Sequence, residues 1–316
     1  MRWLAKAALQ KAMSALPRAE SANYLFQRHV ARSLPAREKA LRQKFARAAH
    51  HVEAYAEHGP PRPLGEAVFY EFGAGWDLAV QLSYWCLGVE RQLLVDLRPN
   101  LRFELVNVTL ERLHRLAAEL GREAGQKARV PDAAPIGSAH ELEQRFGIVY
   151  LAPRDARDSG LEPGSVDFVT STNTLEHVPA RDIVPILAEC QRLLRPDGAL
   201  SSRIDLRDHF AYFDRDLSRY NFLRYSDKAW EVLNSSVLYQ NRLRRPDYLR
   251  AFEEAGLTIV REDAARPNEA ELDRLRRQKV AECFRTYALD DLGVQSLALV
   301  ARPSPDAVEQ GAHVAG

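Results

Sequence analysis

The strongest constraint on the fold is a glycine turn that follows a buried strand. Residues 68–72 read Val-Phe-Tyr-Glu-Phe and run directly into Gly73 and, after one alanine, Gly75. Glycine lacks a Cβ, so the turn can adopt positive φ and a ligand can lie against its backbone. The carboxylate of Glu71 would repel a pyrophosphate at this turn. Leu78 also stands where a dinucleotide-binding Gly-x-Gly-x-x-Gly turn needs a small residue. We therefore predict a turn that binds a nucleoside cofactor without phosphates.

A second short strand ends in a carboxylate at a suitable distance from that turn. Residues 92–95 read Gln-Leu-Leu-Val and lead into Asp96, 21 positions after Gly75. Folds that bind nucleotides on a parallel sheet place a ribose-binding acid at about this spacing. Asp96 is therefore a candidate acceptor for both ribose hydroxyls. The alternative is a structural acid that caps the segment around Pro99 and Asn100.

Strand and helix patterns alternate along the rest of the chain. This alternation predicts an α/β fold with a seven-stranded, doubly wound and mostly parallel sheet. The further strands are expected at residues 148–151, 165–171, 199–205, 257–261 and 294–301, and the helices at 107–120, 183–194, 246–255 and 269–284.

From about Val68 to Asp205, the order of these motifs resembles the class I S-adenosylmethionine-dependent methyltransferases, with weaker similarity up to Arg302. The resemblance implies a Rossmann-like methyltransferase fold and S-adenosylmethionine as the cofactor, whose ammonium and sulfonium groups suit an acidic turn. It also implies roles for individual residues. The methionine part would lie among Glu71, Gly73, Gly75 and Asn173, the ribose would bind Asp96, and the adenine would meet Asp155 and Ala156. Trp76 and Asp77 depart from the small residues that many members have there.

The amino-terminal part of the chain is basic and amphipathic. Residues 1–50 hold 11 Lys and Arg against Glu20 and Glu38, and an apolar helical face includes Leu4, Ala8 and Ala12. Residues 1–58 are therefore expected to form a helical extension that packs on the main domain. The alternatives are a reversible contact of residues 1–50 with an anionic membrane surface, or an Arg-rich transit peptide. The proline-rich segment 58–65 is the predicted linker, residues 59–303 the cofactor-binding domain, and residues 304–316 a flexible tail.

The composition and charge of the chain limit the kinds of partner that we expect. A net charge of +1 gives no overall attraction to nucleic acid, and none is expected as a partner. Cys86, Cys190 and Cys283 are widely spaced, so neither a disulfide framework nor a metal site is predicted. With 46% hydrophobic and 28% charged residues, the chain is expected to be cytoplasmic, with the inner membrane face as a peripheral alternative.

An insertion after the fifth strand, at about residues 207–245, is predicted to act as a lid over the acceptor. It is rich in aromatic residues and ends in an arginine cluster. Tyr212 and Tyr220 are candidates for stacking on the acceptor, and Arg242 and Arg244 for holding an acceptor carboxylate or phosphate. The alternative is a small helical subdomain with its own aromatic core.

The chemical step also has candidates. Methyl transfer to a hydroxyl requires an aligned acceptor and a group that takes its proton. His209 follows Asp205 by four residues, so one helical turn would let the carboxylate orient the imidazole. His177, after the fourth strand, is the second candidate base. We expect a small-molecule or glycan-type acceptor and favour oxygen as the methylated atom. The alternatives are a catalytically silent S-adenosylmethionine-binding scaffold and a nicotinamide-dependent dehydrogenase, which Glu71 and Leu78 oppose.

Overall fold

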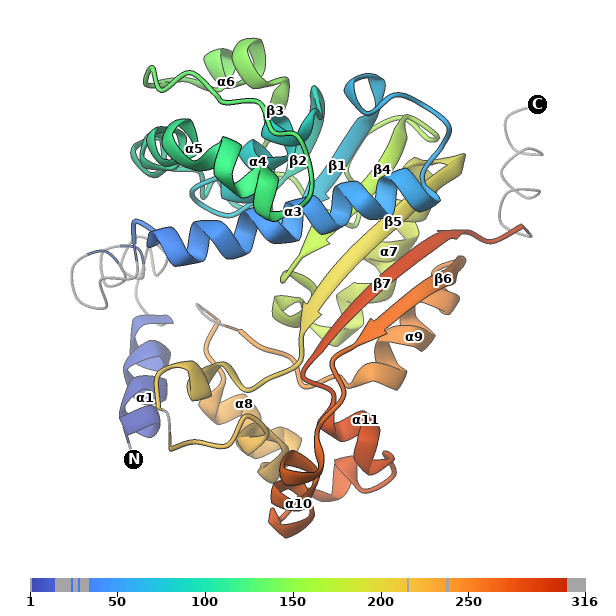
Figure 1. Cartoon of the computed structure of the whole chain (residues 1–316). Helices are drawn as coiled ribbons and strands as arrows, with labels where there is room; N and C mark the ends of the chain where they lie inside the picture. Colours follow the sequence, from blue (N-terminus) through green and yellow to red (C-terminus); the bar gives the residue numbers. More distant parts are fainter. Residues whose placement is uncertain are drawn as a thin grey trace.

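A seven-stranded sheet lies at the centre of the molecule (Figure 1). The computed structural model describes residues 2–14, 24, 28, 34–214, 216–236 and 239–305. The strand order is β3-β2-β1-β4-β5-β7-β6. Only β7 runs antiparallel to its neighbours in this described part. The prediction of a doubly wound, mostly parallel sheet is thus confirmed. The strands are β1 (Val68–Phe72), β2 (Arg91–Val95), β3 (Ile148–Leu151), β4 (Val166–Thr172), β5 (Leu194–Asp205), β6 (Leu257–Ala264) and β7 (Ser296–Pro303).

Helices cover both faces of the sheet, because consecutive strand residues point to opposite sides. Phe69 and Phe168 pack into one core with α3 (Glu38–His58), α4 (Ala79–Leu87) and α5 (Phe103–Glu123). Tyr70 and Val169, one residue further along each strand, pack into a second core with α7 (Ala180–Leu193) and α9 (Arg245–Glu254). Burial on both faces explains why these strands read as nearly continuous apolar runs in the sequence.

An additional helix and the start of one strand differ from the sequence prediction. The segment before β3 contains α6 (Ala139–Phe146), where no helix was predicted. The missed signal is a cap: the Ser138 hydroxyl accepts a hydrogen bond from the Glu141 amide at 3.2 Å. Strand β5 begins at Leu194 and not at Ala199, because residues 195–198 form an irregularity inside the strand, where the register to β4 shifts.

The basic amino-terminal segment divides into two helices with different neighbours. Helix α3 belongs to the layer on the sheet, where Tyr55 lies 5.4 Å from the rings of both Phe69 and Phe168. Helix α1 (Arg2–Ser14) packs on the predicted lid through Trp3, whose ring is 5.4 Å from Phe210. Leu4, Ala8 and Ala12 of the predicted apolar face are exposed. A membrane contact through this face stays a prediction.

The predicted lid lies beyond the carboxyl ends of the parallel strands (Figure 1). The lid contains α8 (Asp227–Leu233), and it packs with α10 (Glu269–Arg277) and α11 (Leu289–Gly293) around a third core. Tyr220, Phe222, Trp230, Leu275 and Phe284 are buried in this core. The aromatic residues of the insertion therefore mainly build a small subdomain, as in the alternative interpretation of the sequence. The helix predicted at 269–284 ends at Arg277, and a 3-10 turn follows at Glu282–Phe284.

Among the described residues, no helix combines the length and the apolar character needed to cross a membrane. Strand β7, the last strand along the chain, ends at Pro303. Most of the tail predicted at 304–316 falls outside the described residues.

Candidate active site

The glycine turn connects β1 to α4 in the predicted manner. Gly73 and Gly75 have φ angles of 77° and 78°, in the left-handed region that disfavours residues with a Cβ. The Gly73 amide donates a hydrogen bond to the Val95 carbonyl of β2 at 2.9 Å. A Cβ on Gly73 would lie 2.5 Å from the Thr174 methyl group, whereas a Cβ on Gly75 would meet open space. The two glycines are therefore required for different reasons.

These two glycines allow a matched test. Gly75→Ala should add only backbone strain of about 1–2 kcal/mol, because its new methyl group meets nothing. Gly73→Ala adds a collision with Thr174, which lines the cavity next to the turn. We expect Gly73→Ala to weaken S-adenosylhomocysteine binding about tenfold more than Gly75→Ala, as measured by titration calorimetry. Equal losses in the two variants would contradict this account of the turn.

The cavity at this edge of the sheet has a volume of about 520 Å³, within the usual range for small-ligand sites. The carboxyl ends of β1, β2, β3 and β4 meet here. Four of the predicted cofactor residues line it, namely Gly73, Asp96, Asp155 and Ala156. The fit to S-adenosylmethionine is good, since the cavity offers carboxylates to hydroxyl and amino groups and a bare backbone at Gly73.

Asp96 is held at the end of β2 by a residue that sequence reasoning missed. The Tyr150 hydroxyl donates a hydrogen bond to Asp96 Oδ2 at 2.9 Å and accepts one from the Asn100 amide at 3.1 Å. Asp96 is only 5% exposed, and it lines the cavity. Tyr150 is thus a positioning residue for the predicted ribose acceptor.

Asp155 follows β3 and is engaged by a neighbouring arginine. Arg157 donates to both Asp155 oxygens at 2.7–3.1 Å and to Asp182 Oδ1 at 2.8 Å. These hydrogen bonds lower the pKa of Asp155. A bound adenine amino group would have to share the Asp155 carboxylate with Arg157, a residue that no sequence motif indicates.

Glu71 and Asn173 lie next to the turn. Burial raises the pKa of Glu71 to about 7, and its Oε2 accepts a hydrogen bond from Gln81 at 2.9 Å. Asn173 has a φ of 55°, and its Oδ1 is buried without a hydrogen-bond partner among the described residues. A buried acceptor without a donor is costly. The ammonium group of a bound S-adenosylmethionine is a suitable donor for it.

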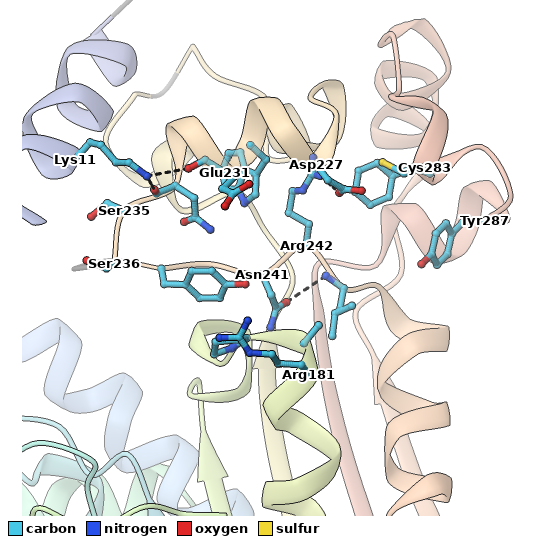
Figure 2. A pocket seen from close by; sticks show the side chains of 17 residues that line it. Lys11, Arg181, Asp227, Glu231, Ser235, Ser236, Asn241, Arg242, Cys283 and Tyr287 are labelled. Atoms are coloured by element: carbon cyan, nitrogen blue, oxygen red, sulfur yellow. Dashed lines mark hydrogen bonds and ion pairs between the residues drawn. The ribbon is translucent and has the colours of Figure 1, made fainter.

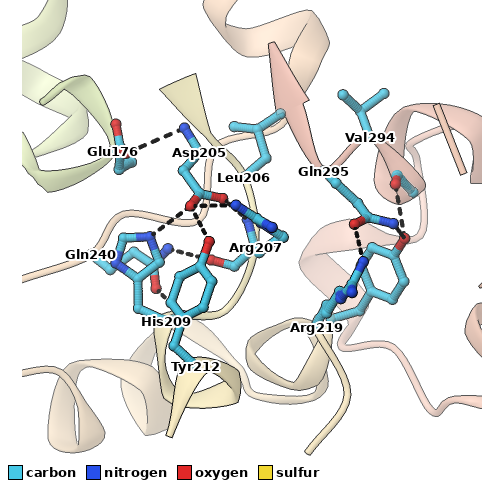
Figure 3. Close-up of polar contacts among 12 residues, drawn as sticks. Glu176, Asp205, Leu206, Arg207, His209, Tyr212, Arg219, Gln240, Val294 and Gln295 are labelled. Atoms are coloured by element: carbon cyan, nitrogen blue, oxygen red, sulfur yellow. Dashed lines mark hydrogen bonds and ion pairs between the residues drawn. The ribbon is translucent and has the colours of Figure 1, made fainter. Parts of the chain in front are cut away.

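A cluster of polar side chains forms where β5 delivers the chain into the lid (Figure 3). Arg207 donates two hydrogen bonds to Asp205 at 2.9 and 3.0 Å, and the Tyr212 hydroxyl also donates to Asp205. His209 Nε2 lies 3.7 Å from Asp205 Oδ2. Burial alone would raise the pKa of Asp205, but its contacts with His209, Arg207 and Tyr212 lower it. The predicted proximity of Asp205 and His209 is thus present in the structure.

The second candidate histidine belongs to the same cluster. The ring centroids of His177 and His209 are 5.0 Å apart, and His177 also lines the cofactor cavity. His177 Nδ1 donates a hydrogen bond to the Tyr239 carbonyl at 2.6 Å, and burial lowers the pKa of His177 to about 4. Glu176, which was not predicted, is fully buried beside them, and burial raises its pKa to about 8.

The four predicted acceptor-binding residues divide into two groups. Tyr212 is half exposed within the Asp205 cluster, and Arg242 lines a second cavity. Tyr220 and Arg244 are buried, and backbone carbonyls take their donors: Tyr220 bonds to Gly293, and Arg244 bonds to Leu206, Leu292 and Val294. These contacts indicate a structural role for both residues, although Arg244 Nε is buried without a hydrogen-bond partner among the described residues.

The second cavity, of about 640 Å³, lies between the lid and the start of α7 (Figure 2). It shares Pro179, Ser236 and Tyr239 with the cofactor cavity. Arg242 forms an ion pair with Asp227 and donates to the Phe222 carbonyl at 2.9 Å, so it mainly fixes the wall. The exposed Arg181 also lines the cavity. Arg181 and Tyr239 are lining residues that no sequence motif indicated.

Comparison with known proteins supports the same family. Residues 117–202 match the model of a methyltransferase domain. Over 83 residues the chain is 32% identical to a ubiquinone biosynthesis O-methyltransferase of Xanthomonas campestris pv. campestris (strain B100), covering 26% of this chain and 34% of that protein. The corresponding protein of Burkholderia pseudomallei (strain 1710b) is 28% identical over 145 residues, or 45% of this chain and 58% of that protein. The matches thus span between one third and three fifths of these relatives.

Solved structures of low identity also align with the chain. Geranyl diphosphate C-methyltransferase from Streptomyces coelicolor A3(2) is 15% identical, with a TM-score of 0.46 over 92% of this chain and 87% of that one. The 1,6-didemethyltoxoflavin-N1-methyltransferase of Burkholderia thailandensis is 17% identical, with a TM-score of 0.44 over 92% and 91%. Residues 117–202 thus match a methyltransferase domain, and the strand order with an antiparallel β7 and the acidic glycine turn agree with the fold of class I S-adenosylmethionine-dependent methyltransferases.

Proposed function

We propose that the chain transfers a methyl group from S-adenosylmethionine to a hydroxyl oxygen of a small-molecule acceptor. One observation carries the proposal: the cavity that contains Asp96 and Asp155 extends to His177, whose ring lies 5.0 Å from His209 of the lid. The cofactor residues and a cluster able to accept a proton therefore meet at one place. The relatives named O-methyltransferases are consistent with oxygen as the methylated atom.

The residues of this chain would bind the cofactor, orient the acceptor and assist in removing the proton of its hydroxyl group. S-Adenosylmethionine, when bound, supplies an electrophilic methyl group, whose bond to sulfur breaks with the electron pair passing to sulfur. Asp96 and Asp155 fix the nucleoside end, and the turn at Gly73 receives the methionine end. The acceptor enters through the adjoining cavity at Tyr239 and Arg181. Its hydroxyl proton is lost at the cluster of Glu176, His177 and His209 as the new oxygen–carbon bond forms.

The strand order argues against the dehydrogenase alternative. A dinucleotide-binding Rossmann sheet has the order 3-2-1-4-5-6 with parallel strands. Here an antiparallel β7 lies between β5 and β6, and Leu78 occupies the position of the third glycine in a left-handed conformation. Nothing in this arrangement favours a pyrophosphate at the turn.

The proposal is tested with cofactor carrying an isotope-labelled methyl group. The full chain is incubated with matched panels of small phenols and catechols, small amines, and free glycans, and products are identified by mass spectrometry. We expect label only on hydroxyl oxygen, and on the phenol or catechol panel before the glycans. Label confined to amines would contradict the oxygen assignment. Intact cofactor binding with no transfer to any panel would support the silent scaffold instead.

A further inference from the structure

Three potential metal ligands converge in the polar cluster of the active site. One ligand atom each from Glu176, His177 and His209 lies within 4.8 Å of the other two. Glu176 and His177 belong to the short 3-10 turn after β4, and His209 begins the 3-10 turn that opens the lid. No local motif indicates this site, because the three residues come from two distant segments of the chain.

Two polar atoms of these side chains have no hydrogen-bond partner among the described residues, which suggests that they bind a ligand. Glu176 is 1% exposed, and its Oε1 accepts a hydrogen bond from the Asp205 amide at 3.2 Å. Its Oε2 is buried without a hydrogen-bond partner in the described part of the chain, and His209 Nε2, also without a hydrogen bond there, faces Asp205 Oδ2 at 3.7 Å. A buried polar atom without a hydrogen-bond partner is unfavourable. A bound cation would satisfy both of them.

His177 has the orientation that metal-binding histidines usually show. Its Nδ1–H donates to the Tyr239 carbonyl at 2.6 Å. Metal-ligating histidines commonly donate one ring N–H to a carbonyl or carboxylate, which fixes the tautomer and leaves the other nitrogen for the metal. Here that hydrogen bond leaves the lone pair on Nε2.

We propose that Glu176, His177 and His209 bind one divalent transition-metal ion. Two imidazoles and one carboxylate suit zinc and related ions better than magnesium or calcium, which prefer oxygen ligands. Metal bonds of about 2.0–2.2 Å place neighbouring ligand atoms roughly 3–4 Å apart, so these atoms, which lie within 4.8 Å of one another, need to close by at most about 1–2 Å. Nearby, Arg207 already pairs with Asp205. Glu176 therefore supplies the negative charge for the cation.

The role of the ion follows from the position of His177, and this step rests on the proposed methyl transfer. His177 lines the cofactor cavity. With three protein ligands, a tetrahedral ion keeps one open position, which the acceptor oxygen can occupy. Coordination lowers the pKa of the hydroxyl, whose proton leaves to water before the oxygen attacks the methyl carbon. In this arrangement His209 is a metal ligand and not the base.

The test uses cobalt(II) as a spectroscopic substitute for zinc. The full chain is stripped with a chelator and titrated with cobalt(II), and binding is followed by the visible absorption of the ion. We expect one ion per chain, in four- or five-coordinate geometry, displaced by an equal amount of zinc. Glu176→Gln and His209→Ala should each weaken cobalt binding at least about 100-fold. The control His140→Ala changes an exposed histidine of α6 and should bind as the unchanged chain does.

S-Adenosylhomocysteine affinity, measured in the same samples, separates the two proposals. Unchanged affinity in Glu176→Gln and His209→Ala shows that the variants are folded. No cobalt signal in the unchanged chain, or equal cobalt affinity in all four proteins, would overturn the metal site while cofactor binding and methyl transfer still stand. If the unchanged chain does not bind S-adenosylhomocysteine, the proposed function itself is refuted.

Discussion

His209→Ala is expected to lower turnover with a hydroxyl acceptor by about 10²–10⁴-fold, the usual contribution of a positioned group that assists proton removal. The imidazole lies 3.7 Å from Asp205 and next to His177, which itself lines the cofactor cavity. Cofactor affinity should change little, because His209 does not line the cofactor cavity. Single-turnover rates and calorimetry measure the two effects separately.

Two further variants make this result specific. Asp205→Asn should cost less than His209→Ala, because it removes a charge that orients the cluster and leaves the imidazole in place. His140→Ala, on the exposed side of α6, should turn over at the original rate. Full activity of His209→Ala would show that the acceptor needs no help from this side chain. If added zinc raises the rate of the stripped chain but not that of His209→Ala, the residue acts as a ligand.

Arg244→Ala should lower the free energy of unfolding by about 3–5 kcal/mol, the largest stability effect expected from a single side chain here. The Arg244 side chain is fully buried, and its guanidinium donates hydrogen bonds of 2.6–2.8 Å to the carbonyls of Leu206, Leu292 and Val294. Its removal leaves three buried acceptors unpaired and opens a cavity beside Phe222. The lid would lose its attachment to α11 and to the end of β5.

Arg250→Ala provides the matched control for this stability measurement. Arg250 is on α9, the helix that begins directly after Arg244, but its side chain is 61% exposed and it forms a surface ion pair with Asp247. Such a pair contributes about 0–1 kcal/mol. Urea denaturation monitored by tryptophan fluorescence should therefore separate the two variants clearly. A loss below about 1 kcal/mol in Arg244→Ala would mean that water replaces the guanidinium without cost.

The sheet could be predicted because its strands are short apolar runs that end at or next to acidic residues. Glu71, Asp96 and Asp205 each mark the carboxyl end of a strand, and the alternation with helices set the parallel topology. The lid was harder to interpret, since an aromatic side chain at a ligand surface and one in a small core look alike in sequence. Tyr212 remained near the active site, whereas Tyr220 and Trp230 are buried in the third core.

Residues of the candidate active site could be predicted only where a sequence motif fixes the spacing between them. The glycine turn and Asp96 follow such a motif, but Tyr150, which holds Asp96, and Arg157, which holds Asp155, depend on contacts that no local pattern records. Glu176 was overlooked for a similar reason. Its importance arises from burial next to a histidine of the lid, and that proximity exists only after the chain has folded.

Titration calorimetry on the full chain tests the central claim, cofactor choice at this pocket, most directly. We expect S-adenosylmethionine and S-adenosylhomocysteine to bind with one site per chain and NAD not to bind. Asp96→Ala should weaken the binding of both by about 1–3 kcal/mol, because the ribose hydroxyls lose a charged acceptor. Equal affinity for NAD, or an unchanged dissociation constant for S-adenosylhomocysteine in Asp96→Ala, would contradict the assignment of this cavity.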